Sequence, residues 1–407
     1  MKNSIKNPPA KSKSKTEAFR FAHPFFTTVP ITERTLLRGV GKRMTDHIKT
    51  KLAKIPRAKR TPVIKLEEII GSSGVTAIEN EKQISFHAVG DTGHENGNAQ
   101  ELVADAMTKD FNISKPEKSP AFFLHLGDVI YYDNTDKGYH AQFYVPYKKY
   151  PGKIIAIPGN HDGELFKWDN TSTGQKITLE AFQKNFCLKK AAVPSAAGTI
   201  YRQSVSQPAV YWLLKSPFVN IIGLYSNVGE NPGYIQGGEA GTKQKTWLNK
   251  TLAALRKERA TGISKALIIA VHHPPLSHGA HSSSSDMLAD IDDSCNKSGI
   301  MPDAVLAAHS HDYQRFTRYL SFKNKNIEIP FIVAGTGGRG LSTHVAAADG
   351  SKKGDHTFDK SLRGYGYLTI TVSATILKIE FYEVNGKTGA SKLFDTVAVD
   401  LKTNRLK

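Results

Sequence analysis

The sequence predicts an α/β protein, because short apolar runs alternate with amphipathic segments through most of the chain. Five of these runs are four to six residues long, and each leads within three residues to a side chain that can bind a metal ion. Continuous apolar runs of this length are typical of strands buried on both faces. Open α/β sheets place their sites beyond the carboxyl ends of such strands, so five ends in series predict one site. The runs are residues 84–89, 122–126, 154–157, 267–271 and 305–308.

The first 65 residues are expected to form a basic arm. They contain 17 Lys or Arg and 3 Asp or Glu, so +14 of the net charge of +18 lies here and +4 in the remainder. Residues 1–25 have the Lys-, Ser- and Pro-rich composition of a disordered segment. Residues 35–55 carry apolar side chains at helical spacing, with Lys and Arg on the other face, which predicts an amphipathic helix. This helix either docks on the body or offers a basic surface to an anionic partner such as a nucleic acid.

Alternating strands and helices are predicted from residue 84 onward. Amphipathic helices are expected within residues 98–111 and 241–260, and extended segments at 209–214 and 219–224 are expected to add strands to a second sheet.

At the carboxyl end, residues 366–372 and 376–384 alternate apolar and polar side chains, and Asn385-Gly386 is a strong hairpin signal. An antiparallel β ribbon is therefore expected, followed by a last strand near 393–399. We divide the chain into a basic N-terminal extension (1–80), a domain that carries the site (81–345) and C-terminal strands that complete the same domain (346–407).

Length and composition bound the remaining possibilities. The chain has 407 residues, of which 39% are hydrophobic and 23% charged, as in ordinary soluble globular proteins. The chain contains no run of about 18 apolar residues, so no transmembrane helix is predicted. No apolar stretch of secretory type follows the charged amino terminus. A cytoplasmic location is expected, with export by another route as the alternative. Cys187 and Cys295 are expected to be buried thiols, a single bridge between them being the alternative.

The residues at the five strand ends form an ordered set of motifs. Carboxylate, amide and imidazole donors of this kind suit a pair of metal ions that acidify water and clamp substrate phosphate. The set resembles the signature blocks of calcineurin-type metallophosphoesterases, specifically their purple acid phosphatase branch, and the match covers about residues 84–340. In chain order the blocks are Gly90-Asp91-Thr92-Gly93, Gly127-Asp128-Val129-Ile130-Tyr131, Gly159-Asn160-His161-Asp162, a block ending at His272, and Ala308-His309-Ser310-His311.

The resemblance implies a four-layer sandwich of two packed mixed β-sheets flanked by helices. It also implies two metal ions. Asp91, Tyr131 and His311 hold one ion, Asn160, His272 and His309 hold the other, and Asp128 bridges them.

Two details of these blocks can be decided only in the folded structure. His273 competes with His272 for the ligand position, although the His-x-Pro spacing favours His272, and Ala308 stands where the family usually has Gly, so this turn must accept a Cβ.

Tyr131 is the most discriminating residue of the set. Most of the superfamily begins with an Asp-x-His pair whose histidine is a ligand, whereas this chain has Gly93 at that position. Tyr131 is expected to take the vacant ligand position, the alternative being that Tyr131 and Tyr132 are packing residues. A phenolate suits Fe(III), so we expect Fe(III) at Tyr131 and Fe(II), Zn or Mn in the second position.

Further residues are expected to contact the substrate. The resemblance implies that His161 faces the substrate and binds phosphate or protonates the leaving oxygen, with Asp162 orienting its ring. His278 and His281, in the loop after His272, are candidates for lining the pocket. Arg339 lies in a Gly-rich run that lacks the Lys-Ser/Thr of a P-loop, which favours a tight turn near the site with Arg339 as a substrate contact.

The function expected from these residues is hydrolysis of phosphate monoesters, by in-line attack of metal-bound hydroxide with His161 assisting the leaving group. Two alternatives are open. A phosphodiesterase or nucleotide hydrolase needs only a differently shaped pocket on the same centre. A protein that binds an anionic partner or nucleic acid would use the basic arm instead, although few aromatic residues are interleaved with its charges, as such binding usually requires. Oligomeric state cannot be read from the sequence.

Overall fold

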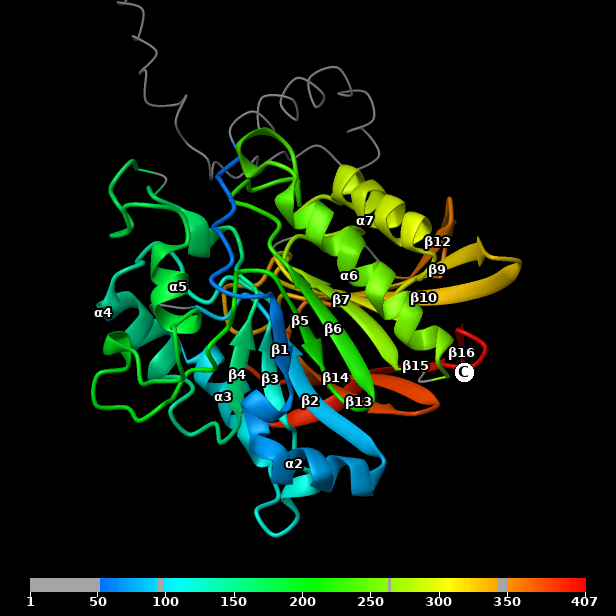
Figure 1. Ribbon diagram of the computed structural model, residues 1–407. Helices are drawn as coiled ribbons and strands as arrows, with labels where there is room; N and C mark the ends of the chain where they lie inside the picture. Colours follow the sequence, from blue (N-terminus) through cyan, green and yellow to red (C-terminus); the bar gives the residue numbers. More distant parts are fainter. Residues whose placement is uncertain (1–51, 94–97, 168, 263–264, 343–347, 349) are drawn as a thin grey trace, which may run out of the picture.

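The computed structural model describes residues 52–93, 98–167, 169–262, 265–342, 348 and 350–407 (Figure 1). Most of the amphipathic helix expected at 35–55 lies outside the described residues, and its last four residues, 52–55, are not helical. The use of the basic arm by an anionic partner therefore stays a prediction. Among the described helices, none is both long and apolar enough to cross a membrane.

Two mixed β-sheets form the centre of the molecule, which confirms the predicted fold class (Figure 1). The larger sheet has the strand order β1 (Val63–Lys65), β5 (Trp212–Lys215), β6 (Val219–Leu224), β7 (Ala266–Val271), β8 (Ala304–Ala307), β10 (Lys325–Ala334), β9 (Tyr313–Phe322), β12 (His356–Leu362) and β11 (Lys352–Lys353). The smaller sheet has the order β16 (Arg405–Leu406), β15 (Ser391–Asp400), β14 (Ile376–Val384), β13 (Tyr365–Ser373), β2 (Gln83–Val89), β3 (Phe122–His125) and β4 (Lys153–Ala156).

The strands that lead to the predicted site run parallel within each sheet. β2 pairs with β3 and β3 with β4 in the smaller sheet, while β6, β7 and β8 pair in parallel in the larger one. Every residue of β3, β7 and β8 is buried, as their continuous apolar sequences predict. The predicted C-terminal ribbon is present as β13 to β16, and β13 pairs antiparallel with β2, with Leu368 opposite Ala88. The ribbon therefore extends the sheet that carries the first aspartate.

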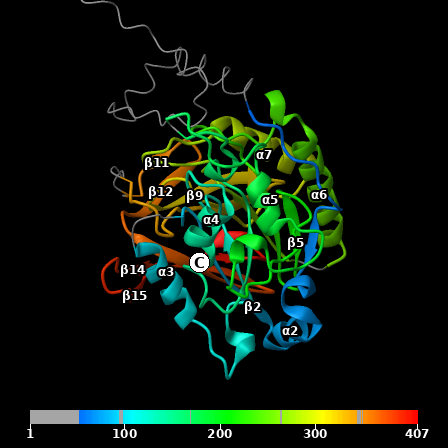
Figure 2. The ribbon, with the colours of Figure 1, turned by 90° about the vertical axis from the view of Figure 1, so that its left-hand side faces the viewer.

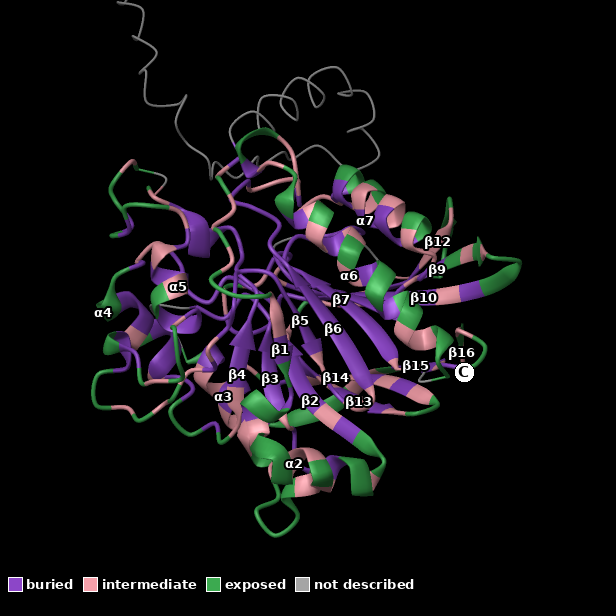
Figure 3. Ribbon diagram, viewed as in Figure 1, coloured by how far each residue is buried: buried purple, intermediate pink, exposed green. Residues whose placement is uncertain are grey.

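Helices cover the outer faces of both sheets (Figure 2). The helices on the outer faces are α3 (Ala99–Lys109), α4 (Asp136–Tyr139), α5 (Glu180–Phe186), α6 (Lys243–Ala260) and α7 (Ser285–Ser298), with a π-helical turn at His140–Tyr144. α2 (Glu67–Glu81) instead places Ile69 and Ile78 in the core between the sheets. α6 and α7 bury one face each against β5, β6 and β7. α3 and α5 belong to the apolar cluster on the outer face of the smaller sheet, and the inner faces of both sheets form the largest core. Figure 3 shows the resulting pattern of buried strands between half-exposed helices.

The structure differs from the sequence analysis at the N-terminal side. The end of the segment assigned to the N-terminal extension, up to residue 80, contains β1 and almost all of α2. β1 pairs in parallel with β5, and Ile64, Leu66 and Ile69 are buried in the core between the sheets. A strand of three residues gives too short an alternating pattern to be recognised in the sequence. Cys187 and Cys295 are both buried free thiols, as predicted.

The packing between the sheets leads to a test of stability. The Phe86 ring is fully buried in the core between the sheets, and it stacks on Phe122 of the neighbouring strand β3 with 4.8 Å between ring centroids. Phe86→Ala is expected to lower the free energy of unfolding by about 3–5 kcal/mol, because the cavity adds to the lost transfer energy. Urea unfolding followed by circular dichroism measures this change.

Ile113→Ala is the control, because Ile113 is 94% exposed and its truncation is expected to change stability by about 0.5 kcal/mol or less. Equal midpoints for the two variants would contradict tight packing between the sheets at Phe86.

Candidate metal centre

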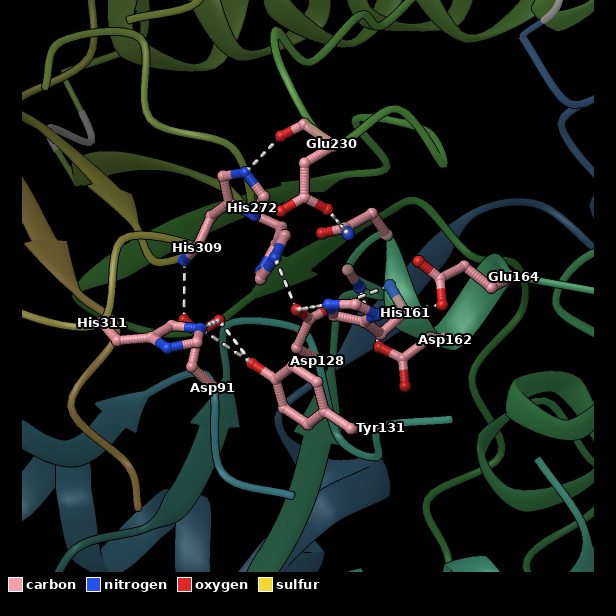
Figure 4. Close-up of polar contacts among 12 residues, drawn as sticks. Asp91, Asp128, Tyr131, His161, Asp162, Glu164, Glu230, His272, His309 and His311 are labelled. Carbon is pink, nitrogen blue, oxygen red and sulfur yellow. Dashed lines mark hydrogen bonds and ion pairs between the residues drawn. The ribbon is translucent and has the colours of Figure 1, made fainter. Parts of the chain in front are cut away.

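The side chains from the five predicted strand ends meet in one place (Figure 4). β2, β3 and β4 reach it from the smaller sheet, and β7 and β8 reach it from the larger sheet. The site therefore bridges the two sheets, and residues more than 200 positions apart in the chain become neighbours. One example is Asp91, whose Oδ2 accepts a hydrogen bond of 2.6 Å from the backbone amide of His309.

Glycines allow the strand ends to approach this closely. A Cβ on Gly127 would lie 2.6 Å from Nδ1 of His272, and a Cβ on Gly90 would lie 2.5 Å from the Cβ of Ala308. The missing side chain of Gly90 thus leaves room for the methyl group of Ala308. The left-handed backbone conformation of this turn falls on His309, with φ of 68°, and not on Ala308. Alanine at this position is accommodated without strain of its own.

Three of the predicted ligands have left-handed backbone conformations. The φ angles are 55° at Asp91, 52° at Asp128 and 68° at His309. Such conformations cost of order 1–3 kcal/mol each for residues other than glycine and are concentrated at functional sites. Here they direct the three side chains into the space between the sheets.

Asp91, Tyr131 and His311 form one half of the cluster. The Tyr131 hydroxyl lies 2.9 Å from Oδ1 of Asp91 and 3.2 Å from Nε2 of His311, and Nε2 of His311 lies 3.4 Å from Oδ1 of Asp91. Nδ1 of His311 is 2.7 Å from the carbonyl oxygen of Gly340, to which it donates a hydrogen bond when protonated. Nε2 is then the ring nitrogen that can bind a metal ion. The structure thus brings together the three residues predicted to share one ion.

Asp128 and His272 form the middle of the cluster. Nε2 of His272 lies 3.3 Å from Oδ2 of Asp128, while Nδ1 of His272 is 2.9 Å from the carbonyl oxygen of Leu126. His273 is engaged elsewhere, because its ring nitrogens are 2.7 Å from the Ser226 hydroxyl and 2.6 Å from the Gly229 carbonyl oxygen. The geometry therefore selects His272 over His273 as a donor.

Asn160 and His309 complete the cluster beside Asp128. Nε2 of His309 is 2.6 Å from the carbonyl oxygen of Glu230, which leaves Nδ1 as the free ring nitrogen. Nδ2 of Asn160 lies 3.4 Å from Oε2 of Glu230, so the amide oxygen of Asn160 is the atom that can bind a metal ion. Asp128, His272 and His309 each offer a ligand atom within 4.8 Å of the other two.

Poorly satisfied polar atoms indicate that this cluster is built for cations. Oδ1 of Asn160 is buried without a hydrogen-bond partner, and Oδ2 of Asp128 and Nε2 of His272 are buried without a hydrogen bond, 3.3 Å apart as an ion pair. A buried polar atom left unsatisfied costs about 1–3 kcal/mol. All three are predicted ligand atoms, and carboxylate, amide and imidazole donors suit transition metals. The residues present therefore fit a metal centre.

The charges of the cluster are strongly coupled. Burial alone raises the pKa of the Asp128 carboxyl, but His272 and His161 hold it below its usual value. Burial lowers the pKa of His272, yet Asp128 and Asp91 raise it to about 9. The two carboxylates thus make the space between the sheets attractive to positive charge.

Comparison with known proteins identifies the family. A family model described as calcineurin-like phosphoesterase matches residues 84–313 of this chain. The chain belongs to the calcineurin-like phosphoesterase family. A search of curated proteins returned no match.

Solved structures of the same fold are distant in sequence. The Plasmodium protein GAP50, described as the anchor in the inner membrane complex, aligns with a TM-score of 0.54 and 13% identity over 79% of this chain and 91% of its own. A structure of PhoD aligns with a TM-score of 0.45 and 12% identity over 87% of this chain and 73% of its own. The likeness to GAP50 shows the shared fold and nothing about its use.

The surroundings of Gly93 leave no room for the histidine that would complete an Asp-x-His pair. A Cβ at Gly93 would lie 2.7 Å from Cα of Ile130 and 2.9 Å from the carbonyl oxygen of Val129. The loop that carries Tyr131 therefore fills the space in which a side chain at position 93 would start. The backbone amide of Tyr131 is fixed by a hydrogen bond of 2.8 Å to Oε1 of Gln142, which keeps this loop in place.

His161 lies beside the cluster, but the prediction that Asp162 orients it is wrong. Nδ1 of His161 lies 3.0 Å from Oε2 of Glu164, and Nε2 lies 4.0 Å from Oδ2 of Asp128. The Asp162 carboxylate instead accepts hydrogen bonds from the backbone amides of Val129 and Gly159. Asp162 therefore ties the β3 and β4 loops together, and Glu164 is the acid that holds the imidazole.

The other predicted substrate contacts separate into two groups. The His281 ring lies 4.1 Å from the ring of His309. The Arg339 guanidinium lies 4.3 Å above the ring of Tyr131, and its backbone amide donates to the Asp91 carbonyl. The ring of His278 packs 4.8 Å from that of Phe358, on β12, and 5.3 Å from that of Phe316, on β9. The structure therefore corrects the prediction that His278 lines the pocket.

The sequence analysis missed Glu164 and Glu230. With His161 they offer a second set of three ligand atoms within 4.8 Å of one another. Burial raises the pKa of Glu230 to about 7. No motif marked Glu230, because it lies in an irregular loop after β6. Glu164 offered one signal, its spacing of three residues from His161 in a turn.

The predicted role of Asp128 as a ligand shared by two ions leads to a test of metal content. Asp128→Asn is expected to lower the content of both metals, because the substitution removes the shared negative charge. Inductively coupled plasma mass spectrometry on protein purified without added chelator measures this content.

Asp395→Asn is the matched control. Asp395 is a partly buried carboxylate that pairs with Arg315 and accepts a hydrogen bond from Tyr313, away from the cluster. Its variant is expected to keep the wild-type metal content, and equal content in the two variants would contradict the bridging role of Asp128.

Proposed function

We propose that this chain is a two-metal hydrolase of phosphate monoesters, of the purple acid phosphatase type. The observation that carries the proposal is the convergence of seven donor residues on one space between the sheets, with His161 at its edge. They are Asp91, Asp128, Tyr131, Asn160, His272, His309 and His311. Two ions bound there would acidify water and neutralise the charge of the phosphoryl group.

The donor set supports a division of the two metals. Tyr131, Asp91 and His311 give one position a phenolic oxygen, a carboxylate and an imidazole, within 3.4 Å of one another. Hard anionic oxygen donors of this kind favour Fe(III), whereas the amide of Asn160 and two imidazoles favour Fe(II), Zn or Mn. We assign Fe(III) to the Tyr131 position on this chemistry.

His161 is suited to protonate the leaving alcohol. Burial lowers the pKa of its imidazole, but Glu164 and Asp128 raise it well above the usual value, which favours the protonated ring. The contact between Nδ1 and Glu164 fixes the ring and leaves Nε2 toward the metal cluster. A general acid held in this way contributes typically 10²- to 10⁴-fold to the rate.

Three groups would hold and orient the substrate phosphate. His281 lies against His309 with its Nδ1 2.9 Å from Nδ2 of Asn231, which fixes the ring. Arg339 is half-buried over the Tyr131 and Tyr132 rings, and a guanidinium in this position can form two hydrogen bonds with phosphate oxygens. Together with His161 they surround the cluster with positive or hydrogen-donating groups.

Loss of the general acid gives a test of the reaction. With p-nitrophenyl phosphate, His161→Ala is expected to lower kcat about 10²- to 10⁴-fold, while metal content stays at the wild-type level. Steady-state kinetics measure the effect, and removal of metal by a chelator is expected to abolish turnover.

His278→Ala is the matched control, since His278 packs on β9 and β12, and its kcat should remain near wild type. Glu164→Gln should reduce kcat less than His161→Ala, because the imidazole remains. Preference for bis-p-nitrophenyl phosphate over the monoester would contradict the monoester assignment and favour a phosphodiesterase.

The metal assignment is tested by colour. Iron-loaded wild-type protein is expected to absorb visible light through a tyrosinate-Fe(III) charge-transfer band, and Tyr131→Phe is expected to lose it. Tyr132→Phe, one residue further along the same loop, is expected to keep the band. A colourless protein that hydrolyses phosphate esters with Mn or Zn would overturn the iron assignment and leave the reaction class intact.

A further inference from the structure

A second groove lies outside the metal centre. It encloses about 980 Å³ between three segments of the chain. One wall is residues 54–58, the second is formed by residues 165, 176–178 and 183, and the third is residues 239–243 at the start of α6. The volume is within the range of small-ligand and peptide pockets. None of the residues assigned to the metal centre lines it.

The N-terminal wall is held in a fixed position. The side chain of Asn227 makes two hydrogen bonds of 2.9 Å with the backbone of Ala53, and Leu52 is buried beside Tyr234 and Ala240. The amide of Lys59 donates to the carbonyl of Pro208 at 2.8 Å. In Figure 1 this blue segment runs down the face turned toward the viewer, to β1. Its side chains are therefore presented on a rigid backbone.

Positive charge surrounds the groove. Lys54, Arg57, Lys176 and Lys243 line it and are exposed, and Glu239 is the acidic residue among the lining side chains. In the described part of the chain, no acidic side chain forms an ion pair with any of these four cations. The start of α6 adds to this charge, because the Thr242 side chain does not cap it and its first turn contains no acidic residue.

The floor of the groove is apolar. Ile55, Pro56, Leu165, Ile177 and Tyr211 lie between the charged residues. Ile177 is 63% exposed, although isoleucine is among the residues most often buried. A small inorganic anion would leave this apolar surface in contact with water. The groove instead suits a ligand that carries both negative charges and apolar side chains.

We propose that this groove is a docking site for a short acidic peptide segment with interleaved apolar residues, supplied by a partner protein. Carboxylates of the segment would face the four cations on the rim, and its apolar side chains would cover Ile177 and the half-buried Ile55 and Leu165. Charge complementarity of this kind directs association and selects partners. The site does not depend on the metal centre or on the reaction assigned to it.

The test uses a dye-labelled octapeptide of alternating glutamate and leucine, with fluorescence anisotropy as the readout. Full-length protein is expected to bind it, and Arg57→Glu combined with Lys243→Glu should weaken binding at least about tenfold. Ile177→Ser should also weaken it, although less. Binding should fall as salt rises, because exposed charges are screened.

The control is Lys118→Glu combined with Lys402→Glu, which changes the net charge equally at exposed positions outside the groove. It should bind the peptide as wild type does. Hydrolysis of p-nitrophenyl phosphate should be the same in all these variants, so failure of the docking site and failure of the proposed reaction are separate results.

Two outcomes would overturn the proposal. Equal binding of the peptide by the groove variant and the control would place the contact elsewhere. Binding of tripolyphosphate or phosphatidylserine vesicles through Arg57 and Lys243, without binding of the peptide, would show that the groove takes a different class of anion.

Discussion

The burial of Asp91 and Asp128 is the constraint on which the centre of this molecule depends. Removing a carboxylate from water costs several kcal/mol unless it is paired and hydrogen-bonded. The backbone amide of His309 donates to Asp91 at 2.6 Å, and that of His161 donates to Asp128 at 3.0 Å. The first of these bonds joins the end of β2 to the loop after β8, so it also links the two sheets. The hydrogen bond from His309 to Asp91 therefore both stabilises the buried charge and holds the two sheets together at this end.

The loops around the aspartates are shaped by the same requirement. A Cβ on Gly335 would lie 2.7 Å from Oδ2 of Asp91. The amide of Gly337 donates to the carbonyl of Gly90, and that of Arg339 donates to the carbonyl of Asp91. The Gly-rich run from 335 to 340 thus supports the backbone of Asp91, and this role accounts for its glycines without a P-loop. Its last residues carry Arg339 and the Gly340 carbonyl to the metal cluster, so the same turn also fixes His311.

Much of the site could be predicted from the sequence, because each ligand follows a strand that its own residues define. The buried strands β2, β3, β4, β7 and β8 are local apolar runs, and parallel strands bring their carboxyl ends to one edge. The missing parts depend on tertiary contacts. Glu230 reaches the cluster only through the path of an irregular loop. His278 and His281 are three residues apart in a loop without a periodic pattern, and nothing in the sequence shows that one packs on β12 and the other on His309.

The exchange of a histidine for a tyrosine illustrates why single positions cannot be interpreted alone. Gly93 has no room for a side chain, because Ile130 and the carbonyl of Val129 occupy that space. Those two residues immediately precede Tyr131, whose hydroxyl lies between Asp91 and His311. The loop that excludes a histidine at position 93 is therefore the same loop that delivers the phenol. A histidine restored at position 93 would collide with this backbone before it could reach a metal, so the two positions form one structural unit, and the choice of ligand follows from how the β2 and β3 loops pack.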